Sequence, residues 1–332
     1  MTIYFLDDAV GNDGNAGTSE GAGNAWLTVD KALSTVVAGD KVWVKDSGIY
    51  SEDAALDTPG TNISPIIMEG YATTTGDGGK ATIAAVSVSC ILIGAITASG
   101  NHHYGWRNFI FDGAGGSGTA YSTGAADSLT FINSEFINAG NVGLAADNQI
   151  LCYKCIFDNN AAVGALTDVA IFIASRFSNN GASLTQAQIE KGLFIFCEAY
   201  GGINGQAAMR FDASTWPVGT INCTLDGENT TTSIAVLFDG NNMPGPAICI
   251  NNIIYDFATG VRVDTAFGEM QVIGHNLLNS NSVADYAGGA QNTIGGDVTG
   301  APVFTDEPGD DYSLNRGSSP AVDAGTDAED LP

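Results

Sequence analysis

The sequence predicts an all-β chain, a single-stranded right-handed parallel β-helix of about eleven coils with a short N-terminal capping helix. Three observations support this class. The 332 residues include 43 Gly and only 14% are charged, which is typical of many short strands and turns. Short apolar segments recur about every 24 residues. Between 130 and 200 these segments leave no room for a helix of about ten residues, so helical repeats do not fit.

Residues 1–40 are expected to form an N-terminal cap, a loop followed by an amphipathic helix. In AWLTVDKALSTVV (25–37), Trp26, Val29 and Leu33 recur at helical spacing, with Lys31 on the opposite face. A helix before the first coil would cover the open end of the solenoid, whose strand edges otherwise pair with other chains.

Residues 41–300 are expected to form the coils. The repeated segments share an alternating apolar strand, most often followed by Asn, Gly or Asp. They are KVWVK (41–45), PIIME (65–69), VSVSCILI (86–93), WRNFIFDG (106–113), TFINSEFIN (130–138), LCYKCIFDNN (151–160), IFIASRFSNN (171–180), LFIFCEAYGG (193–202), GTINCTLDG (219–227), ICINNIIYD (248–256) and VIGHNLLN (272–279). This pitch predicts stacked coils of two or three strands each, because the leucine ladder of the leucine-rich repeat is absent.

Aligning the repeats yields two columns of residues. The first column is mostly large and consists of Phe111, Phe136, Phe157, Phe177, Ala199, Leu225, Ile254 and Leu278. The second lies two residues earlier and consists of Phe109, Ser134, Cys155, Ser175, Cys197, Cys223, Asn252 and Asn276. Strand side chains alternate between faces, so both columns are expected to point into the interior. We expect Asn252 and Asn276 to hydrogen-bond to each other.

Residues 301–332 are expected to form a closing coil and tail, and both ends of the chain resemble one family. GNDGNAGTSEGAGNAWLTVDKAL (11–33) and AGDKVWVKDSGIYSE (38–52) resemble the cap and first coil of pectin-lyase-like right-handed β-helix proteins. APVFTDEPGDDYSLNRGSSPAVDAG (301–325) resembles their closing coil. The resemblance implies the fold. It does not select a function, because the family includes polysaccharide lyases, hydrolases, epimerases, adhesins and phage spike or fibre proteins.

The charge balance excludes some partners. The chain has 11 Lys and Arg against 37 Asp and Glu, a net charge of −26. Such a field repels phosphate backbones and anionic lipid, so we expect neither nucleic-acid binding nor membrane insertion. No apolar run reaches about 18 residues. The start, MTIYFLDDAV, lacks the basic region of a secretory signal.

Two sets of residues are candidate metal ligands. Cys152 and Cys155 have the spacing of a zinc or redox half-site, but residues i and i+3 of one strand point to opposite faces, so we expect packing groups. Asp8, Asn12 and Asp13 offer oxygens that suit a weak calcium site. The same three residues also suit a cap turn. No other cofactor is expected.

Catalysis would require outward carboxylates on the stacked strands. The candidates are Glu135, Asp158, Arg176, Glu198 and Asp226. Coils stack about 4.8 Å apart, so we expect Arg176 beside Glu198 and Glu135 two coils from Arg176. The structural alternative is a surface ion pair between Arg176 and Glu198. Ile110, Ile156 and Ile253 interleave with these groups, which favours a face covered by another subunit or a long turn.

The function that we expect is structural or adhesive: a head decoration, fibre or small spike protein of a bacteriophage virion. It would be made in the host cytoplasm without a signal peptide and released by lysis. Its partners would be two further copies in a homotrimer, other virion proteins and, as one option, a cell-surface polysaccharide. The alternative is a polysaccharide lyase or glycoside hydrolase that uses the outward carboxylates. A third reading is a bacterial carbohydrate-binding β-helix.

Overall fold

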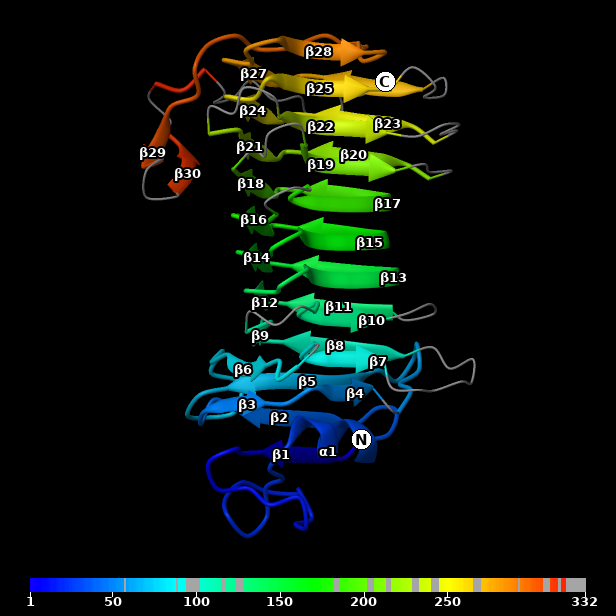
Figure 1. Cartoon of the computed structure of the whole chain (residues 1–332), viewed down its shortest axis with the longest axis vertical. Helices are drawn as coiled ribbons and strands as arrows, with labels where there is room; N and C mark the ends of the chain where they lie inside the picture. Colours follow the sequence, from blue (N-terminus) through cyan, green and yellow to red (C-terminus); the bar gives the residue numbers. More distant parts are fainter. Residues whose placement is uncertain are drawn as a thin grey trace. The chain divides into compact units, whose positions relative to one another are not determined.

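The computed structural model describes residues 1–320 except 57, 88, 94–101, 115–117, 124–127, 182–184, 202–205, 213–215, 229–232, 240–244, 265–269, 292, 307–310 and 316–317. Two compact units divide the chain, Met1–Ala170 (unit 1) and Ile171–Pro332 (unit 2). Both are built from parallel strands that pair with the equivalent strand one turn away (Figure 1). The chain is therefore an all-β, right-handed-type parallel β-solenoid with almost no helix, which confirms the predicted class.

Unit 1 contains three ladders of stacked strands. The first ladder comprises β1 (Ile3–Leu6), β2 (Lys41–Lys45), β5 (Ile66–Tyr71), β8 (His103–Arg107), β11 (Ser128–Ile132) and the second half of β13 (Val142–Tyr153). The second comprises β3 (Ile49–Ser51), β6 (Ala81–Ala84), β9 (Phe109–Asp112), β12 (Glu135–Ile137) and β14 (Ile156–Asp158). The third comprises β4 (Ala54–Leu56), β7 (Ile91–Ile93), β10 (Tyr121–Thr123) and the first half of β13. The boundary between the units falls within β15 (Val163–Ile173).

Unit 2 repeats this plan. Its first ladder comprises the second half of β17 (Ala187–Ile195), β20 (Val218–Ile221), β23 (Ala247–Ile250) and β26 (Gln271–Gly274). Its second comprises β16 (Arg176–Ser178), β18 (Glu198–Tyr200), β21 (Thr224–Asp226), β24 (Ile253–Tyr255) and β27 (Leu277–Asn279). Its third comprises the first half of β17, β19 (Ala207–Asp212), β22 (Ile234–Asp239), β25 (Thr259–Val263) and β28 (Ala284–Gly288).

The number of turns was overestimated. The structure has about eight turns, not eleven. One cause is that PIIME and VSVSCILI were counted as separate coils. PIIME lies in β5, which pairs with β2 and β8, whereas VSVSCILI contains β7, which pairs with β4 and β10. The two segments are strands of different ladders within one turn.

The two aligned columns are confirmed as the core of each unit. In unit 1, Phe111, Phe136 and Phe157 are fully buried. The rings of Phe136 and Phe157 stack with centroids 4.9 Å apart and planes 4° apart. Stacking of this kind contributes about 0.5–1.5 kcal/mol beyond the burial of apolar area. In unit 2, Phe177 and Leu225 occupy the same column and are also fully buried.

From β8 onward, one residue in the left-handed conformation joins the first ladder to the second in each turn. In unit 1 these residues are Asn108, Asn133 and Lys154; in unit 2 they are Ala174, Phe196, Asn222, Asn251 and His275. Asn tolerates positive φ better than other non-glycine residues, which explains its frequency here. This residue reverses the alternation of side chains at the corner. The expectation that Cys152 and Cys155 face opposite sides is therefore wrong: Lys154 (φ 56°) separates them, and both side chains are buried and form no disulfide.

The N-terminal segment contains the one helix among the described residues, α1 (Val29–Thr35). The Thr28 hydroxyl accepts a hydrogen bond from the Lys31 amide and so caps the first turn. Val29 and Leu33 are buried, and α1 packs against β4. A helix is thus present within 25–37. That it closes the solenoid stays a prediction.

The C-terminal segment differs from the coils. The strands β29 (Phe304–Asp306) and β30 (Asp311–Leu314) pair antiparallel, aside from the stacked strands of unit 2 (Figure 1). Residues 321–332 of the expected closing coil and tail lie outside the described residues.

Candidate functional site

The two candidate carboxylates of unit 1 lie on different columns of the second ladder. Glu135 stands in register between Ile110 and Ile156, and its carboxylate forms an ion pair with the Lys80 Nζ at 2.7 Å. Asp158 ends β14 and is in register with Ile137. The two acids are thus one turn apart and offset along the strand.

In unit 2 the register places Arg176 beside Glu198, as the repeat alignment predicted. The Arg176 guanidinium lies 5.5 Å from the centre of the Tyr200 ring. The Tyr200 hydroxyl donates a hydrogen bond to the Glu198 Oε2. Glu198 is therefore tied to its own strand by the tyrosine two residues on.

Asp226 is buried beneath the C-terminal hairpin formed by β29 and β30. It is 4% exposed, and its Oδ2 accepts a hydrogen bond of 2.8 Å from the Tyr255 hydroxyl. Tyr255 packs in turn against Phe304 of β29, with ring centroids 5.4 Å apart. Ile253 and Leu314 lie against the same cluster. The C-terminal hairpin thus covers this part of the second ladder in unit 2, where Ile253 indicated a covered face.

A second set of carboxylates lies on the outward face of the third ladder in unit 2. Asp212 of β19 is in register with Asp239 of β22. Asp264 follows β25, where Val263 is in register with Phe238, so Asp264 lies beside Asp239. The three aspartates occupy one column over three successive turns, and their side chains are 26–34% exposed. We call Asp212, Asp239 and Asp264 the aspartate column.

Two arginines and a glutamine hold the aspartate column in place. The Arg210 Nε donates to the Asp212 Oδ1 at 2.9 Å, and its Nη2 donates to the Asp239 Oδ2 at 2.8 Å. The Gln188 Nε2 donates to the Asp212 Oδ2 at 2.5 Å. Arg262 pairs with Asp264, Nη2 to Oδ1, at 3.0 Å. Arg210 therefore bridges two turns, while both oxygens of Asp212 accept hydrogen bonds.

The surroundings of Asp239 change the pKa of its carboxyl. Burial raises the pKa of Asp239, the hydrogen bond to Asp264 raises it further, and the Arg210 charge opposes both effects. The net direction is upward from the ordinary value of 3.8. Two carboxyls that hydrogen-bond to each other share one proton, because that proton relieves the repulsion between like charges. Asp239 thus retains its proton to higher pH than an isolated carboxyl does.

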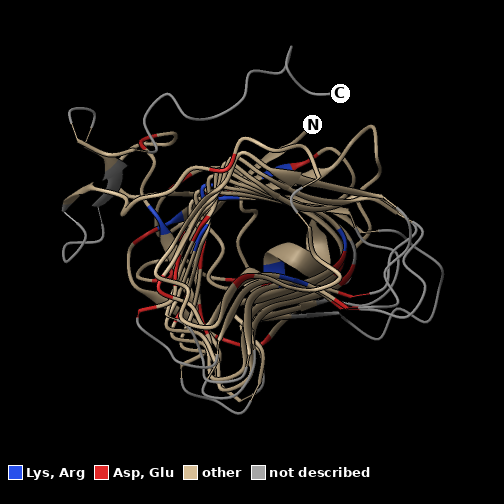
Figure 2. Cartoon of the chain, turned by 90° about the horizontal axis from the view of Figure 1, so that it is seen from above, with Lys and Arg blue, Asp and Glu red and all other residues tan. Residues whose placement is uncertain are grey.

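The repeat alignment missed the aspartate column because it followed the second ladder. A signal was present in the sequence. Arg210-Phe211-Asp212, Leu237-Phe238-Asp239 and Arg262-Val263-Asp264 each place an apolar residue before an aspartate, about one repeat apart. The chain has 37 acidic and 11 basic residues, so such a triplet does not stand out from the other acidic positions (Figure 2).

The expected calcium ligands are engaged in the N-terminal loop. The Asp8 Oδ1 accepts a hydrogen bond from the Ser47 hydroxyl, and the Asn12 Oδ1 accepts one from the Gly14 amide. Asp13 accepts three, from the Leu27 amide and from the amide and hydroxyl of Thr28. Within the described part of the chain, no three His, Cys, Asp or Glu side chains form a group that could hold a metal ion. Calcium binding stays a prediction.

Comparisons with known proteins show the fold. No family model matches the chain, and no curated protein matches it. Pectate lyase Pel9A has a TM-score of 0.50 at 16% identity, over 89% of this chain and 82% of that chain. A rhamnogalacturonan lyase has a TM-score of 0.51 at 12% identity, over 89% and 87%. Geobacillus virus E2 ORF18 has a TM-score of 0.49 at 14% identity, over 89% and 60%. The structural neighbours are thus mainly lyase-like parallel β-helices, and identities this low concern the fold alone. No helix in the described residues is long and apolar enough to span a membrane.

Proposed function

We propose that the protein hydrolyses glycosidic bonds at the aspartate column. The observation that carries this proposal is that the carboxyls of the column lie in different environments: burial and a hydrogen bond to Asp264 raise the pKa of Asp239, while both oxygens of Asp212 accept hydrogen bonds from Arg210 and Gln188. A glycosidase needs one protonated carboxyl and one carboxylate, and groups whose environments differ in this way supply them. Several fold neighbours carry names of polysaccharide-degrading enzymes, which agrees with this class.

The spacing of the turns suggests that hydrolysis inverts the configuration of the anomeric carbon. Asp212 and Asp264 are two turns apart, roughly 9.6 Å between strands that stack at about 4.8 Å. Inverting enzymes hold their two carboxyls about 6.5–9.5 Å apart so that a water molecule fits between base and sugar, and the separation of these two strands lies at the upper limit of that range. In the proposed reaction Asp264 protonates the leaving oxygen, and Asp212 removes a proton from the attacking water. Asp239, whose pKa is raised, supplies the proton that Asp264 donates, through the hydrogen bond between the two carboxyls.

The charges around the aspartate column suggest a neutral glycan. Both arginines at the column are ion-paired with its aspartates, at 2.8–3.0 Å, and the chain carries a net charge of −26. An acidic polymer would meet repulsion here without an uncommitted cation to offset it.

The test is release of reducing ends from a panel of neutral polysaccharides. We expect Asp212→Asn and Asp264→Asn each to lower kcat by about a thousandfold. Asp147→Asn, an exposed aspartate of β13, is the matched control and is expected to leave kcat unchanged. Loss of activity in Glu198→Gln, with activity retained in both column variants, would move the site to the second ladder. Absence of cleavage on every substrate would contradict the proposal.

A second candidate is a structural or adhesive protein of a bacteriophage virion. The observation that favours it is that the second-ladder carboxylates are tied to other side chains: Glu135 to Lys80, Glu198 to Tyr200 and Asp226 to Tyr255. Such a face suits contact or display better than chemistry. The net charge of −26 would keep particles dispersed by mutual repulsion. In this role the chain forms a homotrimer that binds other virion proteins, and α1 closes the N-terminal end of unit 1.

Size-exclusion chromatography with light scattering tests the trimer. Three copies of the 34.1 kDa chain would be expected to elute as one species. A monomer at all concentrations would contradict the trimer. Genes for capsid or tail proteins beside this gene would favour the virion role, whichever assembly is found.

A further inference from the structure

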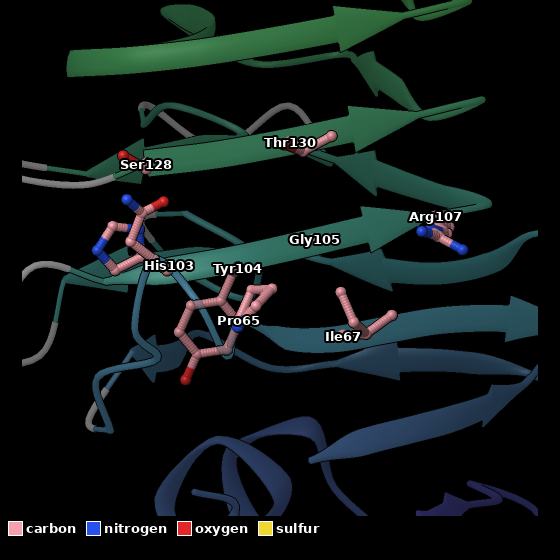
Figure 3. Close-up of a pocket in the computed structure, with 9 residues that line it drawn as sticks. Pro65, Ile67, His103, Tyr104, Gly105, Arg107, Ser128 and Thr130 are labelled. Carbon is pink, nitrogen blue, oxygen red and sulfur yellow. The ribbon is translucent and has the colours of Figure 1, made fainter. Parts of the chain in front are cut away.

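A hollow lies on the outward face of the first ladder in unit 1. Tyr104 and Trp106 of β8 are buried, so His103, Gly105 and Arg107 alternate with them and face outward. Gly105 has no side chain and leaves a gap between His103 and Arg107, whose Cα atoms are about 13 Å apart along an extended strand. The hollow has a volume of about 270 Å³ and is also lined by Asn62, Pro65, Ile67, Ser128 and Thr130. Figure 3 shows His103 and Ser128 at one end and Arg107 at the other.

The loop beside the hollow is held in place before any ligand arrives. The Tyr104 hydroxyl donates a hydrogen bond of 2.8 Å to the Thr58 carbonyl. Thr61 and Ser64 exchange backbone hydrogen bonds of 3.0 and 3.1 Å. A Cβ on Gly60 would lie 2.2 Å from the His103 carbonyl oxygen, so the loop packs directly on β8. A preformed wall lowers the entropy cost of binding.

The charge at the hollow is opposite to that of the chain. Its lining contains Arg107 and His103 and no Asp or Glu, in a chain with 37 acidic and 11 basic residues. The Arg107 Nη1 lies 3.8 Å from the Glu69 Oε2, and the same oxygen lies 2.9 Å from the Lys41 Nζ. One negative charge is thus shared by two cations, which leaves a net charge of about +1 beside the hollow. This arrangement attracts a small anion.

We propose that this hollow binds a sugar acid. The ligand carboxylate pairs with Arg107, which offers the planar donors that carboxylates prefer. Its hydroxyls bond to Ser128, Thr130 and His103, and the apolar face of its ring lies on Ile67 and Pro65. The volume suits one sugar ring, so the ligand is a single acidic residue at the end or on a branch of a glycan. The acidic residues elsewhere on the chain weaken the binding of this anion only slightly, because charges are screened beyond about 8 Å at physiological ionic strength.

Binding at the hollow does not depend on hydrolysis at the aspartate column, which lies in unit 2. The experiment is calorimetric titration of the full chain with glucuronate, glucose and acetate. We expect glucuronate to bind at least about tenfold more tightly than glucose or acetate, because it alone offers both the carboxylate and the ring. Equal affinity for glucuronate and glucose would overturn the proposal, as would the absence of glucuronate binding.

Two variants locate the binding. Arg107→Gln removes the cation and is expected to weaken glucuronate binding at least about tenfold, with a smaller loss in Arg107→Lys. Gly105→Val fills the hollow and is expected to abolish binding. A Cβ at Gly105 meets only the Ile67 Cδ1, at 2.8 Å, which is the movable end of a side chain, so this variant is expected to fold. Lys191→Gln removes a charge from a strand of unit 2 and is the control. Unchanged binding in folded Arg107→Gln and Gly105→Val would overturn the proposal.

Discussion

The Asn252 side-chain amide donates a hydrogen bond of 3.1 Å to the Asn276 Oδ1, one turn further along the second inward column of unit 2. The same oxygen accepts the Asn252 backbone amide at 3.0 Å, and the Asn276 Nδ2 donates to the Cys249 carbonyl at 2.9 Å. Both side chains are buried. Each asparagine therefore satisfies polar groups that no water reaches, as the sequence alignment predicted.

Asn276→Ala is expected to destabilise the protein by about 1–3 kcal/mol, because it removes the acceptor of the buried Asn252 backbone amide and a donor to the Cys249 carbonyl. The measurement is the urea concentration at the midpoint of unfolding. Asn279→Ala, at the partly exposed end of β27, is the control and is expected to change it little. Equal midpoints for the two variants would show that the buried hydrogen bonds contribute nothing.

Phe196→Asn is expected to stabilise the protein by about 1 kcal/mol. Phe196 is 58% exposed and has a φ of 54°, a conformation that asparagine adopts with less strain. The reciprocal change, Asn222→Phe, places a bulky residue at the equivalent corner one turn on, with the same φ of 54°, and is expected to destabilise by a similar amount. Thermal unfolding of both variants checks the sign, and a lower Tm for Phe196→Asn would contradict the argument.

Arg210→Gln is expected to raise the pKa of Asp239. The guanidinium, 2.8 Å from the Asp239 Oδ2, favours the ionised form, while burial and the bond to Asp264 favour the protonated one. Without the cation only the raising effects remain. Carbon NMR of labelled aspartate, followed against pH, measures the change. Arg176→Gln, on the second ladder, serves for comparison; a pKa of Asp239 that falls in Arg210→Gln would refute the assignment.

Lys45→Gln is expected to lower the free energy of unfolding at neutral pH. The variant should also lose less of that free energy than the wild type as the pH falls. Burial would raise the pKa of Asp7, but hydrogen bonds from Ser47 and Lys45, with the Lys45 charge, bring it below 3.8. A carboxyl with a lowered pKa contributes stability above its unfolded pKa and loses it as the pH falls through its folded pKa. The window therefore lies below about pH 4. Lys45 is one-third exposed, so the effect stays under about 1 kcal/mol. Unfolding midpoints between pH 2 and 7 test this, and parallel curves for wild type and variant would contradict it.

Much of the core was readable from the sequence because strand alternation and repeat pitch are local properties. Phe136, Phe157 and Cys155 lie inside as expected, since a column needs only the correct register within each repeat. The errors arose at the corners between strands, where the alternation of side chains along one strand no longer holds. The left-handed Lys154 turned Cys152 and Cys155 to the same side, and β5 and β7 were counted as separate turns although they belong to one.

Some features of the candidate sites could likewise be predicted from the sequence, and others could not. Arg176 and Glu198 were placed side by side from spacing alone, because equivalent strands of neighbouring turns stack in register. The cover over Asp226 was not readable, since Phe304 lies far along the chain from Tyr255 and only the fold of the C-terminal hairpin brings them together. The aspartate column was overlooked because Asp212, Asp239 and Asp264 follow strands of a ladder that had not been aligned.

The amino-acid sequence alone determined that this chain is a parallel β-solenoid and which residues fill its interior, because repeat length, alternation and turn residues act over a few residues each. The tertiary structure decided which outward groups meet. Arg210 bridges Asp212 and Asp239, and Gly105 opens a hollow between Ile67 and Thr130, because winding the chain brings residues a full turn apart to within contact distance. Outward side chains carry no apolar pattern that marks their neighbours, so only the register of successive turns reveals these contacts.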